Sequence, residues 1–143
     1  MKLSTGKVAF PIEFDNGDKQ TIYFNPNDPD LMVRMKNLDA RVQEQIKGMG
    51  DIELTEEGRP SDFSKIDAFD KMQSILKNEL DYAFGGSVSD VVFKHCSPFA
   101  IVGGQYFVEQ FIEAIAPEIE KHIKKANADA EKRMAKHIDK YKK

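Results

Sequence analysis

A chain of 143 residues fits one domain with a single core and leaves no room for a second independent domain. Apolar residues make up 41% and charged residues 31%, as in ordinary globular proteins, and the single cysteine, Cys96, excludes an internal disulfide and favours the reducing cytosol. The net charge of −3 is unevenly divided, because residues 1–120 hold 12 Lys and Arg against 21 Asp and Glu, whereas residues 121–143 hold 9 against 3.

The first residues, MKLSTGKVAF, contain no apolar stretch of the length that a signal peptide needs. Nor does any apolar run in the chain approach the roughly 20 residues of a membrane span. We therefore expect a protein of the cytoplasm that has no membrane partner.

Alternating apolar and polar side chains over residues 8–14 and 20–24 predict a β-hairpin. A two-residue loop at Asn16-Gly17 would turn half of the apolar side chains to the wrong face, so a three-residue loop, with Gly17 in the left-handed conformation, is preferred. The pairs predicted in this register are Val8–Phe24, Phe10–Ile22 and Glu13–Lys19.

A first helix is predicted to begin at Asp28, as N-cap, and Pro29 and to end before Gly48. Its core-facing stripe consists of Leu31, Met35, Leu38, Val42 and Ile46. The acidic segment that follows, residues 48–60, is long for a loop of a compact domain, which makes it a candidate functional segment.

A second helix is expected to start near Ser61 to Ser64, with Ser64 and Asp67 in capping-box spacing, and to end at Phe84-Gly85-Gly86. Its inward side chains are Ile66, Phe69, Leu76 and Leu80. Ser87 and Asp90 repeat the capping spacing at the head of a short helix, and residues 94–98 form a turn.

A third main helix is predicted from about Gln105, where Pro117 either kinks it or begins a new segment. Its apolar stripe consists of Phe107, Val108, Phe111, Ile112, Ile115, Ile119 and Ile123. Residues 124–143 are either a basic helical extension or a frayed tail. The fold class is thus α+β and mostly helical, with one globular domain over residues 1–123 that comprises a hairpin (1–24) and a helical part (28–123).

The sequence offers no convincing catalytic, cofactor or metal site. His95-Cys96 stand alone, and His122 and His137 are too far apart to share a metal ion. Gly85-Gly86 and Gly103-Gly104 lack a phosphate-binding pattern and are interpreted as helix punctuation. The acidic residues of the long loop, Glu53, Glu56 and Glu57, are interpreted as solvated. A non-enzymatic protein without a cofactor is therefore expected.

Two apolar stripes offer more surface than one core obviously needs. The first surrounds the methionines of the first helix, whose adaptable side chains suit varied apolar partners, and the second is the face from Phe107 to Ile119. Ordinary core packing is the competing interpretation of each residue. The candidate protein-binding residues are Met32, Met35, Phe107, Phe111, Ile115 and Ile119.

The basic end of the chain can either bind phosphates or attract an acidic surface. Nucleic-acid binding is the weaker hypothesis, because the body is acidic and no aromatic platform accompanies the lysines. Association with the acidic body of another copy is the stronger one, so a homo-oligomer is expected. The candidate self-association residues are Lys124, Lys125, Lys132, Arg133 and Lys136.

The order of these elements resembles the tail assembly chaperones of long-tailed phages that infect Gram-positive bacteria, and related prophage proteins. The phrases that carry the resemblance are FNPNDPDLMVRMKNL, NELDYAFGGSVSDVVFKHCSPF and YFVEQFIEAIAPEIEKHIKKA, which with the hairpin and the lysine-rich end cover nearly the whole chain. Such a protein coats the tape-measure protein in the host cytoplasm, is displaced as tail-tube protein polymerises, and is absent from the finished virion. The family supplies no functional residues to transfer.

Two other functions fit the same sequence. One is a structural tail-completion or connector protein of a phage, which would remain in finished particles. The other is a nucleic-acid-binding regulator that uses the basic tail, whose DNA binding would depend steeply on salt. The resemblance also raises the expectation of a longer frameshifted product, which the amino-acid sequence alone does not test.

Overall fold

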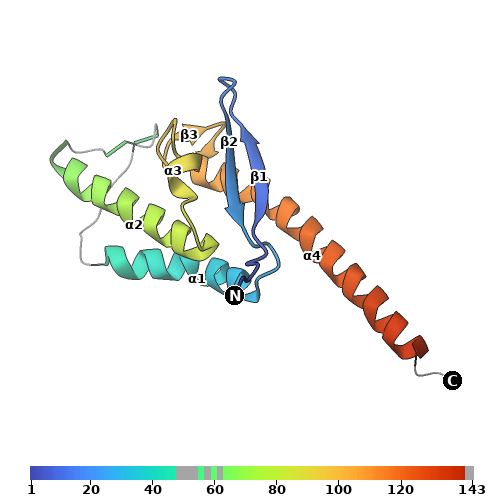
Figure 1. The fold of residues 1–143 in the computed structure, drawn as a ribbon. Helices are drawn as coiled ribbons and strands as arrows, with labels where there is room; N and C mark the ends of the chain where they lie inside the picture. Colours follow the sequence, from blue (N-terminus) through green and yellow to red (C-terminus); the bar gives the residue numbers. More distant parts are fainter. Residues whose placement is uncertain (48–54, 57–58, 61–62, 141–143) are drawn as a thin grey trace.

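The order of elements in the computed structural model is a hairpin, two long helices, a short helix, a second small hairpin and a third long helix (Figure 1). The structure describes residues 1–47, 55–56, 59–60 and 63–140. The fold is α+β and mostly helical, as predicted. The strands and helices are β1 (Val8–Glu13), β2 (Lys19–Phe24), α1 (Pro29–Ile46), the 3-10 turn η1 (Phe63–Lys65), α2 (Ile66–Phe84), α3 (Ser89–Val92), β3 (Ile101–Val102), β4 (Gln105–Tyr106) and α4 (Phe107–Lys140).

The first hairpin has the predicted three-residue loop. The Phe14 amide donates to the Asp18 carbonyl over 2.9 Å, and Gly17 adopts a φ of 87°, a conformation that costs a residue without Cβ little. This turn sets the register, and the alternation of β1 and β2 then places the larger side chains on the core face. The three predicted pairs, Val8–Phe24, Phe10–Ile22 and Glu13–Lys19, are confirmed.

Helix α1 begins as predicted, because the Asp28 carboxylate accepts a hydrogen bond from the Asp30 amide over 3.0 Å and Pro29 occupies the first turn. Leu31 and Val42 are buried, and Met35 and Leu38 are half-buried. The helix ends at Ile46. The predicted stop at Gly48 lies outside the described residues, as do Met49, Glu53 and Glu57 of the acidic segment, whereas Glu56 is exposed.

Helix α2 begins at Ile66, just after the predicted start near Ser61 to Ser64, and the 3-10 turn η1 precedes it from Phe63. Its N-cap is Lys65, which makes no side-chain capping bond. The side chain of Ser64, and with it the predicted capping spacing, lies outside the described residues. Ile66 was predicted to face inward but is 39% exposed. The buried side chains of this helix all fall between Leu76 and Phe84. The first turns of α2 therefore lie at the periphery of the core.

The first turn of α3 is capped by a residue of the preceding helix, α2. Gly85 adopts the left-handed conformation predicted for the end of α2. The predicted local cap of α3 by Ser87 and Asp90 is wrong: the Asp81 carboxylate of α2 accepts from the amides of Val88 and Ser89 over 2.9 and 2.7 Å. The Ser89 hydroxyl donates to the second oxygen of Asp81 over 2.7 Å.

A second small hairpin, formed by β3 and β4, has no predicted counterpart in the sequence. Gly103 and Gly104 have φ values of 61° and 82° and form the two-residue turn between β3 and β4, so they are a strand turn rather than helix punctuation. The carbonyl groups of Ala100 and Pro98 accept from the first two amides of α4 over 2.8 and 3.0 Å. This hairpin thus fixes the start of the last helix.

Helix α4 is continuous from Phe107 to Lys140, so the basic end is helical and Pro117 does not begin a new segment. Proline removes one helical hydrogen bond and leaves the carbonyl four residues earlier without its partner. Here that carbonyl belongs to Glu113, which is exposed, as is Pro117, so water can satisfy it.

The core lies where the first hairpin, the end of α2, α3 and the first half of α4 meet. Phe24 is its centre, because it stacks on Phe10 with ring centroids 4.3 Å apart and meets Phe84 edge to face at 4.8 Å. Phe84 also packs against Phe111 of α4, with ring centroids 5.8 Å apart. The second half of α4 projects from this body (Figure 1). The buried core residues are Phe10, Ile22, Phe24, Leu31, Leu80, Phe84, Val88, Val92, Phe93, Phe111, Ile115 and Ile119.

Candidate functional site

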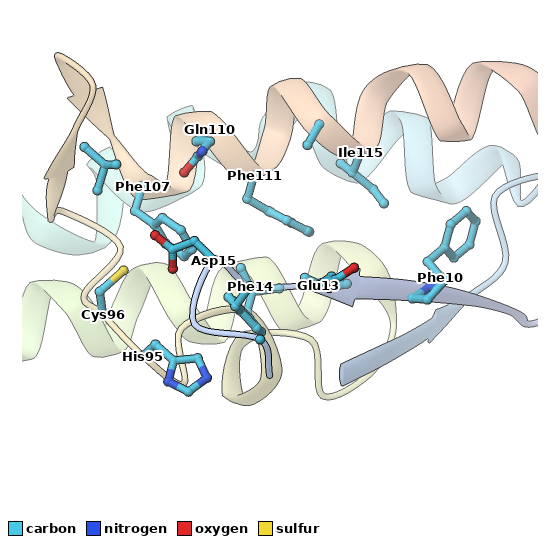
Figure 2. Close-up of a pocket in the computed structure, with 16 residues that line it drawn as sticks. Phe10, Glu13, Phe14, Asp15, His95, Cys96, Phe107, Gln110, Phe111 and Ile115 are labelled. Atoms are coloured by element: carbon cyan, nitrogen blue, oxygen red, sulfur yellow. The ribbon is translucent and has the colours of Figure 1, made fainter. Parts of the chain in front are cut away.

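A groove with a volume of about 950 Å³ runs between strand β1 and the first turns of helix α4 (Figure 2). The loop after α3 contributes His95 and Cys96 to one end of it. The groove is open to solvent and is lined mainly by large apolar side chains. These are Phe10, Ile12, Phe14, Phe107, Phe111 and Ile115.

The wall from α4 presents a regular row of side chains. Phe107, Phe111 and Ile115 are four residues apart, so they lie along one face of the helix and point toward the hairpin (Figure 2). Such a row forms a ridge that can pack beside the side chains of another helix. Ala114 and Gln110 also line this wall and are exposed. The small side chain of Ala114 leaves room for a neighbour.

The structure brings together only part of the candidate protein-binding set. Phe107, Phe111 and Ile115 line the groove, although Phe111 and Ile115 are only 8% and 6% exposed and serve the core as well. Ile119 is a core residue and does not line the groove. Met35 is half-buried against the core. Met32 is 56% exposed on α1, outside the groove.

Several groove residues are not among the candidates predicted from the sequence. Ile12 and Phe14 are half-buried, and Val102 at the tip of the second hairpin is 46% exposed. The alternation over residues 8–14 predicts Ile12 and Phe14 on the apolar face of the strand, and Val102 lies in a segment with no predicted strand. No local pattern indicates that these residues face α4, because the two walls are distant in sequence.

Among the residues that the structure describes, β1 pairs only with β2, and its other edge borders the groove. Hydrogen-bonded pairs alternate along an antiparallel hairpin, so the bond between Phe14 and Asp18 implies that Pro11 and Glu13 direct their backbone groups away from β2. Pro11 has no amide hydrogen and interrupts the donors of this edge. The edge is therefore a poor template for a further strand, and side chains rather than backbone bonds dominate the surface offered to a partner.

The rim of the groove is acidic. Glu13 and Asp15 line it and are both exposed (Figure 2). Within the described part of the chain, neither carboxylate takes part in an ion pair. An apolar floor beside two unpaired carboxylates favours a ligand that combines an apolar face with flanking cations.

A polar cluster fixes one end of the groove. Asp18 accepts from His95 Nε2 over 2.7 Å and from Lys94 Nζ over 3.0 Å, and Asn16 Nδ2 lies 3.3 Å from His95 Nδ1. The hydrogen bond with His95, followed by those from Lys94 and Gln20, lowers the pKa of Asp18 to about 2. This cluster ties the turn of the first hairpin to the loop after α3.

Cys96 and His95 do not form a nucleophile and base pair. The Cys96 sulfur and the His95 ring point in different directions (Figure 2), and the His95 ring packs against Phe14 with ring centroids 4.8 Å apart. Burial, followed by the charge of Asp15, raises the pKa of the Cys96 thiol, which keeps it protonated at neutral pH. Among the residues that the structure describes, no three His, Cys, Asp or Glu side chains gather as metal ligands.

The five candidate self-association residues lie on the second half of α4 and are all exposed: Lys124, Lys125, Lys132, Arg133 and Lys136. Lys124 is held by Glu120 of its own helix at 3.4 Å. We call residues 124–140 of α4 the arm. The arm continues the helix that forms one wall of the groove but carries its cations away from it (Figure 1).

Comparisons of the chain with protein-family models, with curated proteins and with solved structures give no match. No helix in the described residues is both long enough and apolar enough to cross a membrane. The groove and the arm are therefore the features from which a function is inferred.

Proposed function

We propose that this protein is a non-enzymatic phage or prophage tail assembly chaperone that holds apolar helical segments of a tape-measure protein in the groove between β1 and α4. The observation that supports this most is the combination of an apolar floor with the acidic rim of Glu13 and Asp15. An amphipathic helix matches this combination, because its apolar face can cover the floor while its flanking Lys or Arg side chains meet the rim.

A helix suits this groove better than a strand does. Pro11 interrupts the donors of the β1 edge, whereas Phe107, Phe111 and Ile115 supply a ridge with the four-residue spacing of helix packing. The contact area is modest, because Phe111 and Ile115 are already mostly buried. Weak individual contacts repeated along a long client suit a chaperone that tail-tube protein must later displace.

The proposal is tested by co-expression with a tape-measure protein, measuring how much of that protein stays soluble and co-purifies. Ala114→Arg places a long cation in the groove from an exposed helical position and should abolish co-purification. Ala116→Arg is the matched control, because Ala116 is exposed on the same helix but does not line the groove. Equal recovery of the client with both variants would contradict the groove as its site.

A chaperone of this kind acts in the bacterial cytoplasm and leaves the tail before it is complete. Antibody detection of the protein in purified virions separates this function from that of a tail-completion or connector protein. A chaperone is present in infected cells and absent from finished particles, whereas a structural component is present at fixed copy number.

A further inference from the structure

The turn of the first hairpin, residues 14–18, stands beyond the part of the hairpin that the core holds. Ile12 is the last β1 side chain that packs against the core. A two-stranded ribbon has little stability by itself, so the turn needs another attachment to keep its place. Phe14 and Gly17 of the turn line the groove. The position of the turn therefore sets the width of the groove at this end.

His95, which also lines the groove, contacts the turn at three points. Its ring packs edge to face with the ring of Phe14, with centroids 4.8 Å apart. Its Nε2 lies 2.7 Å from Asp18 Oδ2, and its Nδ1 lies 3.3 Å from Asn16 Nδ2. One side chain of the loop after α3 thus holds the turn through both ring nitrogens and through the ring itself.

The hydrogen bonds of Asn16 decide which ring nitrogen of His95 carries the proton. The Asp18 amide donates to Asn16 Oδ1 over 3.0 Å, so the opposite end of the Asn16 side chain, the Nδ2 donor, faces His95. His95 Nδ1 is then an acceptor, and the neutral imidazole carries its proton on Nε2 and donates it to Asp18. The bridge therefore requires a donor and an acceptor on the same side chain.

Lys94 binds the same turn but restrains it less. Its Nζ donates to Asp18 over 3.0 Å. An ammonium on a flexible four-carbon chain fixes distance and direction less well than a planar ring does. His95 is also the one of the two that packs against Phe14, a side chain of the groove. His95 is accordingly the better candidate for setting the position of the groove wall.

Building on the proposed chaperone function, we propose that His95 is a positioning residue, which holds the turn and Phe14 at the distance from α4 that a client helix requires. The side chains of His95 and Asp18 are 32% and 27% exposed, so water can replace their bond. The base of the hairpin is held by the aromatic core instead. The turn is thus the end at which the groove widens when the bridge is removed.

The position of the turn is tested without any client, by pulsed electron paramagnetic resonance. Nitroxide labels on Lys19→Cys beside the turn and Glu113→Cys on α4, in a Cys96→Ser chain, report the distance between hairpin and helix from exposed positions outside the groove. His95→Leu keeps an apolar contact for Phe14 but removes donor and acceptor, so the distances should spread and shift to longer values. His95→Gln carries both functions on one amide and should keep the wild-type distribution.

Lys71→Leu is the matched control, because it introduces a leucine at an exposed position of α2 outside the groove, and it should leave the distances unchanged. Circular dichroism melts establish that every variant is folded. An unchanged distribution in His95→Leu, or a spread in His95→Gln equal to that in His95→Leu, would overturn the proposal.

The bridge itself is tested in the wild-type chain by the imidazole nitrogen chemical shifts of His95, measured at a pH where imidazoles are neutral. The spectrum of His95→Gln identifies the His95 signals among those of His122 and His137. A single form protonated on Nε2 is expected. A form protonated on Nδ1, or a mixture of the two, would contradict the bridge.

Co-purification of a tape-measure protein connects the turn with the client. His95→Leu should recover less client than the wild type, and His95→Gln should recover as much. Full recovery with His95→Leu despite a displaced turn would overturn the role proposed for His95. A wild type that recovers no client would contradict the chaperone function, whereas the distances and nitrogen shifts decide separately whether His95 holds the turn.

Discussion

Glu79 on α2 is a buried carboxylate whose charge is kept by a partner on α1. Arg41 Nε donates to it over 2.6 Å, and Gln45 donates to the other oxygen. The hydrogen bond from Arg41 lowers the pKa of Glu79, although burial acts in the opposite direction. Arg41 is itself held over the ring of Tyr82, with its guanidinium carbon 4.5 Å from the ring centroid. This pair aligns α1 and α2.

Replacing Arg41 by Met should destabilise the fold, because Glu79 is left buried without its cation. The loss is smaller than for a fully buried pair, since Arg41 is half exposed and water can reach the site. The midpoint of urea unfolding measures it. Adding Glu79→Leu should recover most of the loss, and a double variant as unstable as the single one would contradict this account.

The lowered pKa of Asp18 should make the stability of the fold depend on pH in the acidic range. Its pKa is about 2 in the folded protein against 3.8 as the reference value, so the folded state favours the ionised form. The contribution is present above pH 4 and is lost as the pH falls toward 2. The melting temperature of Asp18→Asn should therefore lie below that of the wild type above pH 4 and converge with it near pH 2. A difference independent of pH would contradict the assignment.

At the scale of elements, local patterns were predicted from the sequence and distant contacts were not. The register of the first hairpin followed from Gly17 and strict alternation, and the start of α1 followed from Asp28 and Pro29. The cap of α3 and the bond between Asp18 and His95 join residues that no short motif connects. Strands of two residues, as in β3 and β4, are too short to show a period.

Because Asp81 of α2 caps α3, we can predict which of two nearby carboxylates, Asp81 or Asp90, stabilises the fold. Asp81→Ala removes the acceptor of three hydrogen bonds and should cost about 1 to 2 kcal/mol of stability. Asp90→Ala removes the residue that the local pattern favoured, is exposed, and should be nearly neutral. Urea unfolding of the two variants compares them directly. A larger loss for Asp90→Ala would restore the local capping box.

At the scale of the whole molecule, the groove and the arm differ in how far the sequence predicted them. The position of the groove was not predictable from the sequence, because the two walls are formed by segments that lie about 100 residues apart. The row Phe107, Phe111 and Ile115 was predicted as an apolar stripe, and the structure shows that it serves the core and the groove together. The basic end was predicted from charge alone, whereas its helical form required the structure.

Ending the chain after Ile123 should leave the fold intact, because residues 124–136 are all exposed or half-buried. The stability of this truncated chain should stay within about 0.5 kcal/mol of the full chain in urea unfolding. Ending it after Ile115 removes the buried Ile119 and should cost several times more. A severe loss from the first truncation would mean that the arm stabilises the body.

The position of Pro11 has a consequence for the behaviour of the hairpin wherever the protein is crowded. An unpaired strand edge at high local concentration invites strand pairing between molecules, and repeated pairing leads to fibrils. Pro11 lies in the middle of the unpaired edge of β1 and deprives it of a donor. Pro11 should therefore hinder the hairpins of molecules that meet in a crowded solution from joining into a growing sheet.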